Sequence, residues 1–190
     1  VSQTSLRDLV AFARANPGKV TYASSGIGSV THLMMELLNQ RTGAKFEHVP
    51  YRGTAPATAD LASGRVDMTL ASLASVKPML DRGELRPIAT ATAARIPQLP
   101  DVPTAAEEGI SGMDAPVWVG LVTRAGTPDA VIARLDEALR KVMTNPTLLE
   151  RLDPLGMAPV AQGPAAFTAT LQADAALWKE AVARGNITLN

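Results

Sequence analysis

Residues 19–38 read KVTYASSGIGSVTHLMMELL: a short β-prone run, a turn of serines and glycines, and a run with apolar residues at helical spacing. The run KVTYA predicts a strand over residues 19–23. Apolar residues from Val30 to Leu38 recur at i, i+3, i+4, i+7 and i+8, which predicts an amphipathic helix that closes near Gly43. A strand, a tight turn and a helix form the repeating unit of a parallel α/β sheet, so this stretch indicates that fold class.

The same alternation continues on both sides of this stretch. A helix is predicted from Leu6 until the breaker Asn16-Pro17-Gly18, with Ser5 or Thr4 as its N-cap. Further helices are predicted over residues 54–62 and 76–81, and strands over 46–51, 66–71 and 85–92. Ligands of parallel sheets bind at the carboxyl ends of strands, beside helix N-termini. The serine/glycine turn occupies such a position.

The pattern changes towards the C-terminus. Residues 93–116 predict an ordered, proline-rich loop around a short helix at 104–108, and VWVGLV at 117–122 predicts a fifth strand. Helices are then predicted over 128–143, 146–152 and 164–183. Their apolar stripes need a partner surface, and they include Leu135, Leu139, Phe167, Leu171 and Trp178.

Composition narrows the possible functions. Lys plus Arg and Asp plus Glu number 18 each, so no global field favours nucleic acid, and an anion site must be built locally. The chain has no cysteine, which excludes disulfides, thiolate metal sites and cysteine nucleophiles. No His/Asp/Glu cluster has metal-ligand spacing, so we expect no metal and no cofactor. The start, VSQTSLRDLV, has neither the basic nor the apolar segment of a signal peptide.

The serine/glycine turn allows a dinucleotide interpretation. Gly26 and Gly28 form a GxG pair, and Glu47 lies on the next strand, where an acidic residue would contact a ribose. Thr31, however, stands at the place of the third glycine. A Walker A loop is excluded, because no Gly-Lys-Ser/Thr follows.

A serine-nucleophile interpretation would use Ser29 with His32, three residues later, and His48 lies on the next strand. No Gly-x-Ser-x-Gly elbow is present. A capping serine followed by a half-exposed histidine gives the same spacing. A small serine hydrolase using Ser29 and His32 therefore remains an alternative.

An anion-site interpretation requires only hydrogen-bond donors and positive charge. Ser24, Ser25 and Ser29 offer hydroxyl donors, and Gly26 and Gly28 let backbone N–H groups approach a ligand. The helix N-terminus adds about half a positive charge. Capping alone explains one serine but not three, so the turn favours a carboxylate or phosphate.

Neighbouring side chains are candidates for the same site. Arg52, in Tyr51-Arg52-Gly53 at the end of the second strand, is either a bidentate carboxylate clamp or a solvated turn arginine. His32 is either a neutral donor to a ligand or a packed histidine.

Three segments together resemble one family. ARANPGKVTYASSGIGSVTHL at 13–33, HVPYRGTAPATADLASGRVD at 48–67 and ARIPQLPDVPTAAEEGISGMDAPVWVGLVTRAGTP at 94–128 closely resemble the substrate-binding proteins of tripartite tricarboxylate transporters, the Bug receptors. The similarity runs from about residue 5 to the C-terminus, in family order and spacing.

The resemblance implies a type II periplasmic-binding-protein fold of two α/β lobes, the Venus flytrap. Residues 1–120 would form most of the second, ligand-binding lobe. Residues 121–190 would cross the hinge and supply C-terminal helices of the first lobe. The implied ligand contacts are Ser24, Ser25, Gly26 and Ser29, with Tyr51, Arg52 and Gly53 as neighbours.

Two departures from the family matter. After the third strand, Ala71 and Ser72 stand where the family usually has an acidic residue and an amide, which leaves Ser72 as the candidate contact there. The family also has an earlier half-lobe with its own ligand loop, which this chain lacks. We therefore expect weak ligand affinity. We also expect the helices of 128–183 to fold back on the second lobe, to pair with another copy of the chain, or to expose an apolar patch.

The expected function is a periplasmic receptor, or a fragment of one, and not an enzyme. It would capture a small carboxylate, either a di- or tricarboxylate or an aromatic acid, and deliver it to membrane permease components. No nucleic acid partner is expected, because a helix-turn-helix and a basic patch are both missing from the sequence. A non-binding assembly domain or a regulatory domain of the same fold stays an alternative.

Overall fold

A computed structural model describes residues 2–114 and 117–185. They divide into two compact units. One unit contains the chain up to Val117 together with the end from Glu180, and the other is Trp118–Lys179. The assignment of residues 1–120 and 121–190 to the two lobes of a receptor stays a prediction.

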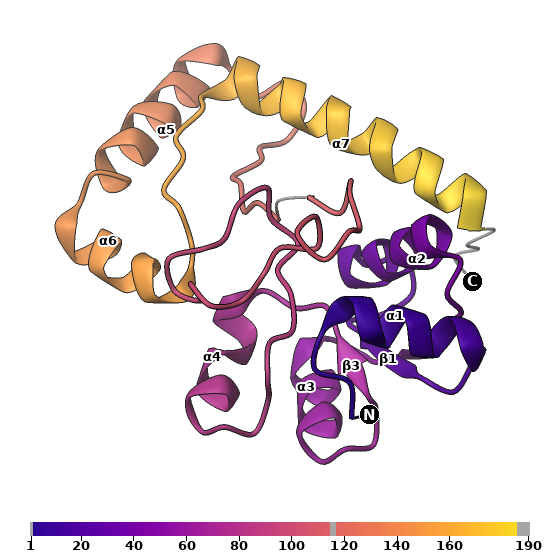
Figure 1. The fold of residues 1–190 in the computed structure, drawn as a ribbon. Coiled ribbons are helices and arrows are strands. Elements are labelled where there is room, and N and C mark those ends of the chain that lie inside the picture. Colours follow the sequence, from indigo (N-terminus) through magenta and orange to yellow (C-terminus); the bar gives the residue numbers. More distant parts are fainter. Residues whose placement is uncertain (1, 115–116, 186–190) are drawn as a thin grey trace. The chain divides into compact units, whose positions relative to one another are not determined.

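The first unit is built on a parallel sheet of three strands in the order β2-β1-β3. The strands are β1 (Thr21–Ser24), β2 (Glu47–Pro50) and β3 (Met68–Thr69). Helix α1 (Leu6–Ala15) precedes β1, and α2 (Val30–Thr42), α3 (Thr54–Ala62) and α4 (Leu73–Asp81) each follow one strand (Figure 1). The predicted α/β class with a parallel sheet is confirmed. The predicted strand 66–71 is shortened to two residues, and the helix predicted from residue 76 begins at Leu73.

The two faces of the sheet are covered by different helices. Ala23 of β1 packs with Ala57 of α3 and with Val66 on one face. Tyr22, the residue before Ala23 in β1, points to the opposite face, where its hydroxyl donates to Glu36 of α2 at 2.7 Å. Buried apolar side chains of α1 and α2 complete this core; the largest fully buried ones are Leu9, Met34 and Met35.

Serines cap the first two helices. The sequence predicts Ser5 or Thr4 as the first cap, whereas for Ser29 it left capping as the alternative to a ligand contact. Ser5 is the N-cap of α1, and its Oγ accepts the Asp8 N–H at 3.1 Å. Ser29 is the N-cap of α2, which ends at Gly43 with φ 66°. A residue with a Cβ would be strained at that φ, so a glycine ends the helix where the apolar pattern ends.

The connection after α4 differs from the sequence prediction. Only Thr90 of the predicted strand 85–92 pairs, in an isolated parallel bridge with Thr104, and the predicted helix 104–108 is a series of turns. Pro87 has no N–H to donate to a ladder. Thr90 donates to Pro103 O and accepts from Ala105 N–H, both at 2.8 Å, so a loop satisfies the backbone that a strand would have used.

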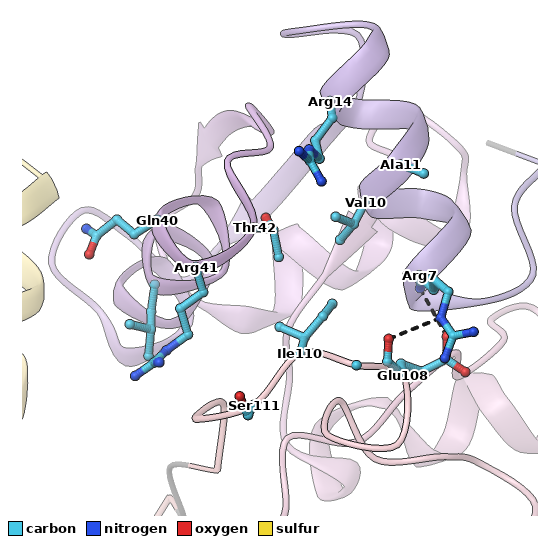
Figure 2. A pocket seen from close by; sticks show the side chains of 12 residues that line it. Arg7, Val10, Ala11, Arg14, Gln40, Arg41, Thr42, Glu108, Ile110 and Ser111 are labelled. Atoms are coloured by element: carbon cyan, nitrogen blue, oxygen red, sulfur yellow. Dashed lines mark hydrogen bonds between the residues drawn. The ribbon is translucent and has the colours of Figure 1, made fainter.

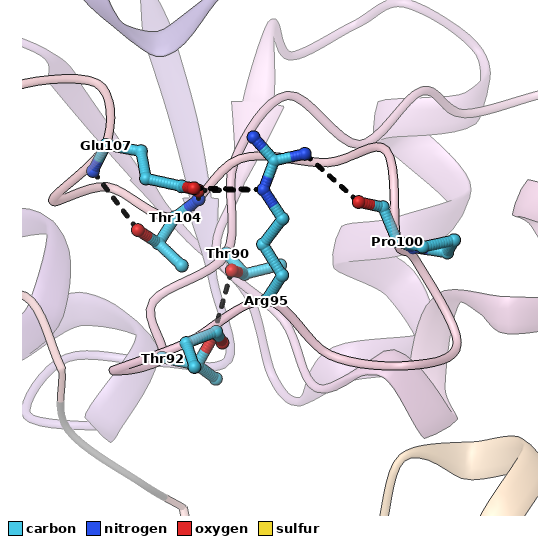
Figure 3. Close-up of polar contacts among 7 residues, drawn as sticks. Thr90, Thr92, Arg95, Pro100, Thr104 and Glu107 are labelled. Carbon is cyan, nitrogen blue, oxygen red and sulfur yellow. Dashed lines mark hydrogen bonds and ion pairs between the residues drawn. The ribbon is translucent and has the colours of Figure 1, made fainter.

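Side chains hold this loop in place (Figure 3). The Glu107 carboxylate accepts the Thr104 N–H at 2.7 Å and Arg95 Nε at 3.0 Å. Thr104 Oγ1 accepts the Glu107 N–H at 3.1 Å in return. Arg95 also donates to Pro100 O at 3.1 Å. Ionic and reciprocal capping bonds thus replace regular secondary structure in this segment.

The second unit is helical. It contains α5 (Asp129–Val142), α6 (Pro146–Leu152), the 3-10 turn η1 (Asp153–Leu155) and most of α7 (Pro164–Gly185). The strand predicted at 117–122 does not form, because a strand needs a ladder partner and these residues have none among those that the structure describes. Trp118 instead meets Phe167 of α7 edge to face, with ring centroids 5.0 Å apart.

Apolar side chains in the second unit remain accessible. No side chain of residues 118–179, a range that the structure describes in full, is buried. The exposed apolar residues include Val119, at 84%, and Leu135, at 43%. Across residues 2–114 and 117–185, no helix combines the length and apolar character needed to span a membrane.

Candidate functional site

The carboxyl edge of the sheet brings three helix N-termini into one region. Because β1, β2 and β3 are parallel neighbours, the helices that follow them, α2, α3 and α4, all begin at the same edge. None of these three helices has an acidic residue in its first turn. Each N-terminus carries about half a positive charge. The edge is therefore suited to an anion.

The serine/glycine turn joins β1 to α2 at this edge. Gly26 has φ 136° and Gly28 has φ 76°, which side chains rarely permit. Gly26 O accepts the Ser29 N–H at 3.2 Å and Ser29 Oγ at 2.6 Å, which closes the turn. A Cβ on Gly26 would lie 3.4 Å from Tyr51 O, so the glycine also permits close approach of the neighbouring chain.

Thr31 links the serines of this turn. Its Oγ1 accepts the Ser25 N–H at 3.0 Å and lies 3.1 Å from Ser25 Oγ and 3.0 Å from Ser29 Oγ. The serine hydroxyls are therefore held in fixed positions by a side chain that the sequence interpretation did not select. A threonine hydroxyl in the first turn of a helix can form hydrogen bonds with the preceding loop. Its position in that first turn is the sequence signal that could have identified Thr31.

Ser24 does not face the solvent. Its side chain is only 1% exposed, and its Oγ lies 2.6 Å from Nε2 of His48 on β2. It also accepts the Gly26 N–H at 3.2 Å. Ser24 thus supports the turn from its buried side, where its hydroxyl is committed to His48 and Gly26.

The predicted Ser29–His32 pair does not form a dyad. Ser29 Oγ accepts the backbone N–H of His32 at 3.4 Å, as an N-cap, and donates to Gly26 O. The His32 ring is turned towards the loop, where its Nδ1 accepts the Gly28 N–H at 3.0 Å. Because the histidine's Nδ1 is engaged by a backbone donor, it does not serve as a base for Ser29.

The second turn, Tyr51-Arg52-Gly53, lies beside the first. The Tyr51 N–H donates to Ser24 O and the Gly53 N–H to Ser25 O, both at 3.1 Å. The Tyr51 side chain points away from the edge and donates to Asp60 of α3 at 2.8 Å. Arg52 is exposed, and no ion pair to its side chain is found within the described part of the chain. Arg52 is free to meet a ligand, whereas the Tyr51 ring is committed to α3.

Two of these helices begin without side-chain caps. Gly53 is the N-cap of α3, and Ser72 is the exposed N-cap of α4, with its Oγ turned to Ser75 at 3.1 Å. Since no side chain caps either helix, the N–H groups of Thr54 and Ala55 in α3 and of Leu73 and Ala74 in α4 are available to another acceptor. Pro56 has no N–H, and the Ser75 N–H donates to Ser72 O at 3.0 Å.

The structure therefore brings part of the predicted set together. Hydrogen bonds join the Ser24–Ser29 turn directly to the backbone of residues 51–53. Ser72 is the N-cap of the helix after β3, at the same edge, and among the described residues no hydrogen bond joins its side chain to that turn.

Burial controls the protonation of the rings beneath the turn. Burial, and to a smaller extent the neighbouring His32, together lower the pKa of His48 from 6.5 to about 4. Burial also lowers the pKa of His32, against an opposing effect of Glu36. Burial, with the hydrogen bond to Glu36, raises the pKa of the Tyr22 hydroxyl well above its usual range. All three rings are uncharged at neutral pH.

A separate cavity of about 760 Å³ lies between α1, the end of α2 and residues 108–111 (Figure 2). In its wall, the backbone N–H of Arg7 donates to the Glu108 carboxylate at 3.1 Å, and the Arg7 side chain donates through Nε to Glu108 O at 3.3 Å. Arg14 and Arg41 also line it. At 1.5 Å of rise per residue, Arg41 lies about 18 Å along α2 from the N-cap Ser29, so the cavity is distinct from the carboxyl edge.

Comparison with known proteins identifies the class of this fold and site. Residues 2–186 match the model of the tripartite tricarboxylate transporter family receptor, TctC. A relative from Pseudomonas sp. strain P51, the UPF0065 protein in the tcbD-tcbE intergenic region, is 34% identical over 97% of this chain and 55% of its own length.

Two solved structures share the fold. Rpa4515 of R. palustris with adipate is 34% identical with a TM-score of 0.91, and 99% of this chain covers 63% of that one. MatC from Rhodopseudomonas palustris with bound malate is 29% identical with a TM-score of 0.86, over 95% of this chain and 63% of that one. The periplasmic-binding-protein fold expected from the sequence is thereby confirmed.

The chain belongs to the tripartite tricarboxylate transporter receptor family. It spans about half the length of the first curated relative and under two thirds of these solved chains.

Proposed function

We propose that this chain is the ligand-binding part of a periplasmic receptor that captures a small dicarboxylate and presents it to the membrane permease of a tripartite transporter. The observation that carries the proposal is the meeting of three helix N-termini at one sheet edge, with no acidic residue in their first turns. Two family members of the same fold have adipate and malate bound, which supports a carboxylate as the ligand class.

The chemistry of the edge suits a carboxylate better than a neutral ligand. Uncapped N–H groups of α3 and α4 are donors aligned with the positive ends of their helices. Arg52 is a free guanidinium beside them and can donate two parallel hydrogen bonds to one carboxylate. Ser25 adds a hydroxyl whose position Thr31 fixes, whereas the Ser29 hydroxyl donates within the turn to Gly26 O.

Binding in this scheme needs no covalent chemistry. Charge-assisted hydrogen bonds to the ligand would provide the differential affinity that stabilises a closed receptor over an open one. The closed form would then dock to the permease. The family assignment supports this partner.

Isothermal titration calorimetry with malate and adipate tests the proposal. We expect both acids to bind and their neutral diamides not to bind. Arg52→Gln should weaken dicarboxylate binding about tenfold or more, because one charge-assisted pair is lost.

Arg14→Gln is the matched control, since Arg14 lines the separate cavity and its loss should leave affinity unchanged. Equal binding of acids and diamides would refute the carboxylate assignment. Loss of binding in Arg14→Gln but not in Arg52→Gln would move the anion site to the cavity.

A further inference from the structure

Three aromatic rings are stacked beneath the serine/glycine turn. Tyr22 of β1 and His48 of β2 are partners in the parallel register, and their ring centroids are 4.8 Å apart with planes 16° apart. His32 of α2 continues the stack, 4.0 Å from His48 and 10° from parallel. The stack thus contains one ring from each of the three elements that meet under the turn.

Both histidines are also bonded to the turn itself. His48 Nε2 holds Ser24 Oγ at 2.6 Å, and His32 Nδ1 accepts the Gly28 N–H at 3.0 Å. A backbone N–H can only donate, so Nδ1 of His32 must be unprotonated and the neutral ring carries its proton on Nε2. A proton on Nδ1 would break the bond to Gly28.

The surroundings compensate a positive charge on these rings only in part, because burial outweighs the favourable effect of Glu36 on a charged His32. Glu36 of α2 already accepts from the Tyr22 hydroxyl at 2.7 Å and from Asn39 at 3.2 Å. Glu47, next to His48 on β2, is exposed, and its alternating side chain points to the other face. Two imidazolium rings 4.0 Å apart would repel one another, and His32 is only 6% exposed.

We propose that His32 and His48 are positioning residues of the ligand turn, and that the turn keeps its binding geometry only while both imidazoles are neutral. The effect on ligand affinity rests on the function proposed above, whereas the effect on the shape of the turn does not. Neither residue needs to touch the ligand in this scheme.

The direction of the pH effect follows from the linkage between proton binding by the histidines and opening of the turn. When the turn opens, both imidazoles are exposed to water and take up protons near pH 6.5. In the closed turn the pKa values of both histidines are lower, and that of His48 is about 4. The closed turn therefore loses stability as the pH falls from 6.5 towards 4, with no further loss from His48 below that. Opening should become up to about tenfold more frequent per pH unit for each histidine that takes up a proton.

NMR of the ligand-free, ¹⁵N-labelled chain tests the shape of the turn from about pH 7.5 to about pH 4. We expect the Nε2–H form of His32 at neutral pH, and loss of Gly28 amide protection over the interval in which the imidazoles titrate. Arg14→Gln, far from the stack, should show the same profile. A Gly28 amide that is insensitive to pH while either histidine titrates would overturn the proposal.

Calorimetry at about pH 7.5 tests the role in binding. His48→Phe keeps a ring in the stack but loses the bond to Ser24, and should weaken malate or adipate binding about tenfold. His48→Gln can still bond Ser24 and should recover most of the affinity; wild-type affinity in both folded variants would contradict the positioning role. If the wild-type chain binds neither acid, the proposed function fails, and the NMR profile alone decides the present inference.

Discussion

The sheet unit and the helical unit contain similar apolar patterns but use them differently. In the sheet unit, Leu9 and Met34 are each 1% exposed, and the buried apolar side chains of the described chain all lie between Leu6 and Met113. In the helical unit, Val131, Leu135 and Val142 recur along one stripe of α5, and all three stay exposed. An amphipathic stripe predicts a helix, but it predicts a core only if a second surface covers it.

The largest expected difference between the units is in the cost of a cavity. Leu9→Ala should lower the free energy of unfolding by about 2–5 kcal/mol, because a fully packed side chain is removed. Leu135→Ala, at a position 43% exposed, should cost less than about 1 kcal/mol. Urea denaturation followed by far-UV circular dichroism measures both changes.

Equal costs for the two leucines would mean that α5 is covered in solution. In that event sedimentation would show whether a second copy of the chain provides the cover, as the expected self-association through 128–183 requires.

A smaller difference is expected for one hydrogen bond in each unit. Tyr22→Phe removes the bond to Glu36 within the core and should cost about 1–3 kcal/mol, since a charged acceptor loses its donor. Trp118→Phe removes the bond from Nε1 to Asp174 at the surface and should cost about 0.5–1 kcal/mol. Thermal melting of the two variants beside the wild type provides the measurement; a larger loss for Trp118→Phe would place a second core in the helical unit.

The smallest effect concerns exposed carboxylates and is sensitive to pH. The Thr104 backbone N–H and then Arg95 lower the pKa of Glu107. Glu107 therefore contributes stability above the pKa of the unfolded chain, and this contribution is lost as the pH falls through the lower folded value. Glu107→Gln should lower the melting temperature slightly at neutral pH and have no effect at about pH 2–3.

Asp136→Asn, which breaks the i,i+4 pair with Arg140 in α5, is the matched change in the helical unit and should cost about 0.3–0.5 kcal/mol at neutral pH. An effect of Glu107→Gln that persists in acid would show that the loop around Thr104 does not depend on this ionised group.

Local patterns were sufficient for the elements that build the sheet unit. The cap at Ser5, the stop at Gly43 and the order of strands and helices around β1 follow from short-range chemistry, and all are confirmed. The predictions of strands at 85–92 and 117–122 were wrong, because β-prone residues form a strand only when another strand offers its backbone for hydrogen bonds. The sequence of a segment does not show whether such a partner strand is present.

The candidate site shows the same division. The turn at Ser24–Ser29 and its place at the sheet edge were predictable, because parallel topology alone puts them there. The roles of His48 and Thr31 became visible only with the register of β1 and β2 and the first turn of α2. The direction of the Tyr51 side chain, towards Asp60, depends on how α3 packs and could not be read from the spacing.

Trp118, which packs edge to face against Phe167, belongs to a distribution of aromatic residues that has a spectroscopic consequence. The chain has two tryptophans, at 118 and 178, and both lie in the helical unit; its two tyrosines, at 22 and 51, both lie in the sheet unit. Selective excitation of indole therefore reports one unit, and second-derivative absorbance, which resolves the phenol bands from the overlapping indole band, reports the other. A single unlabelled sample can show whether the two units unfold together or one after the other.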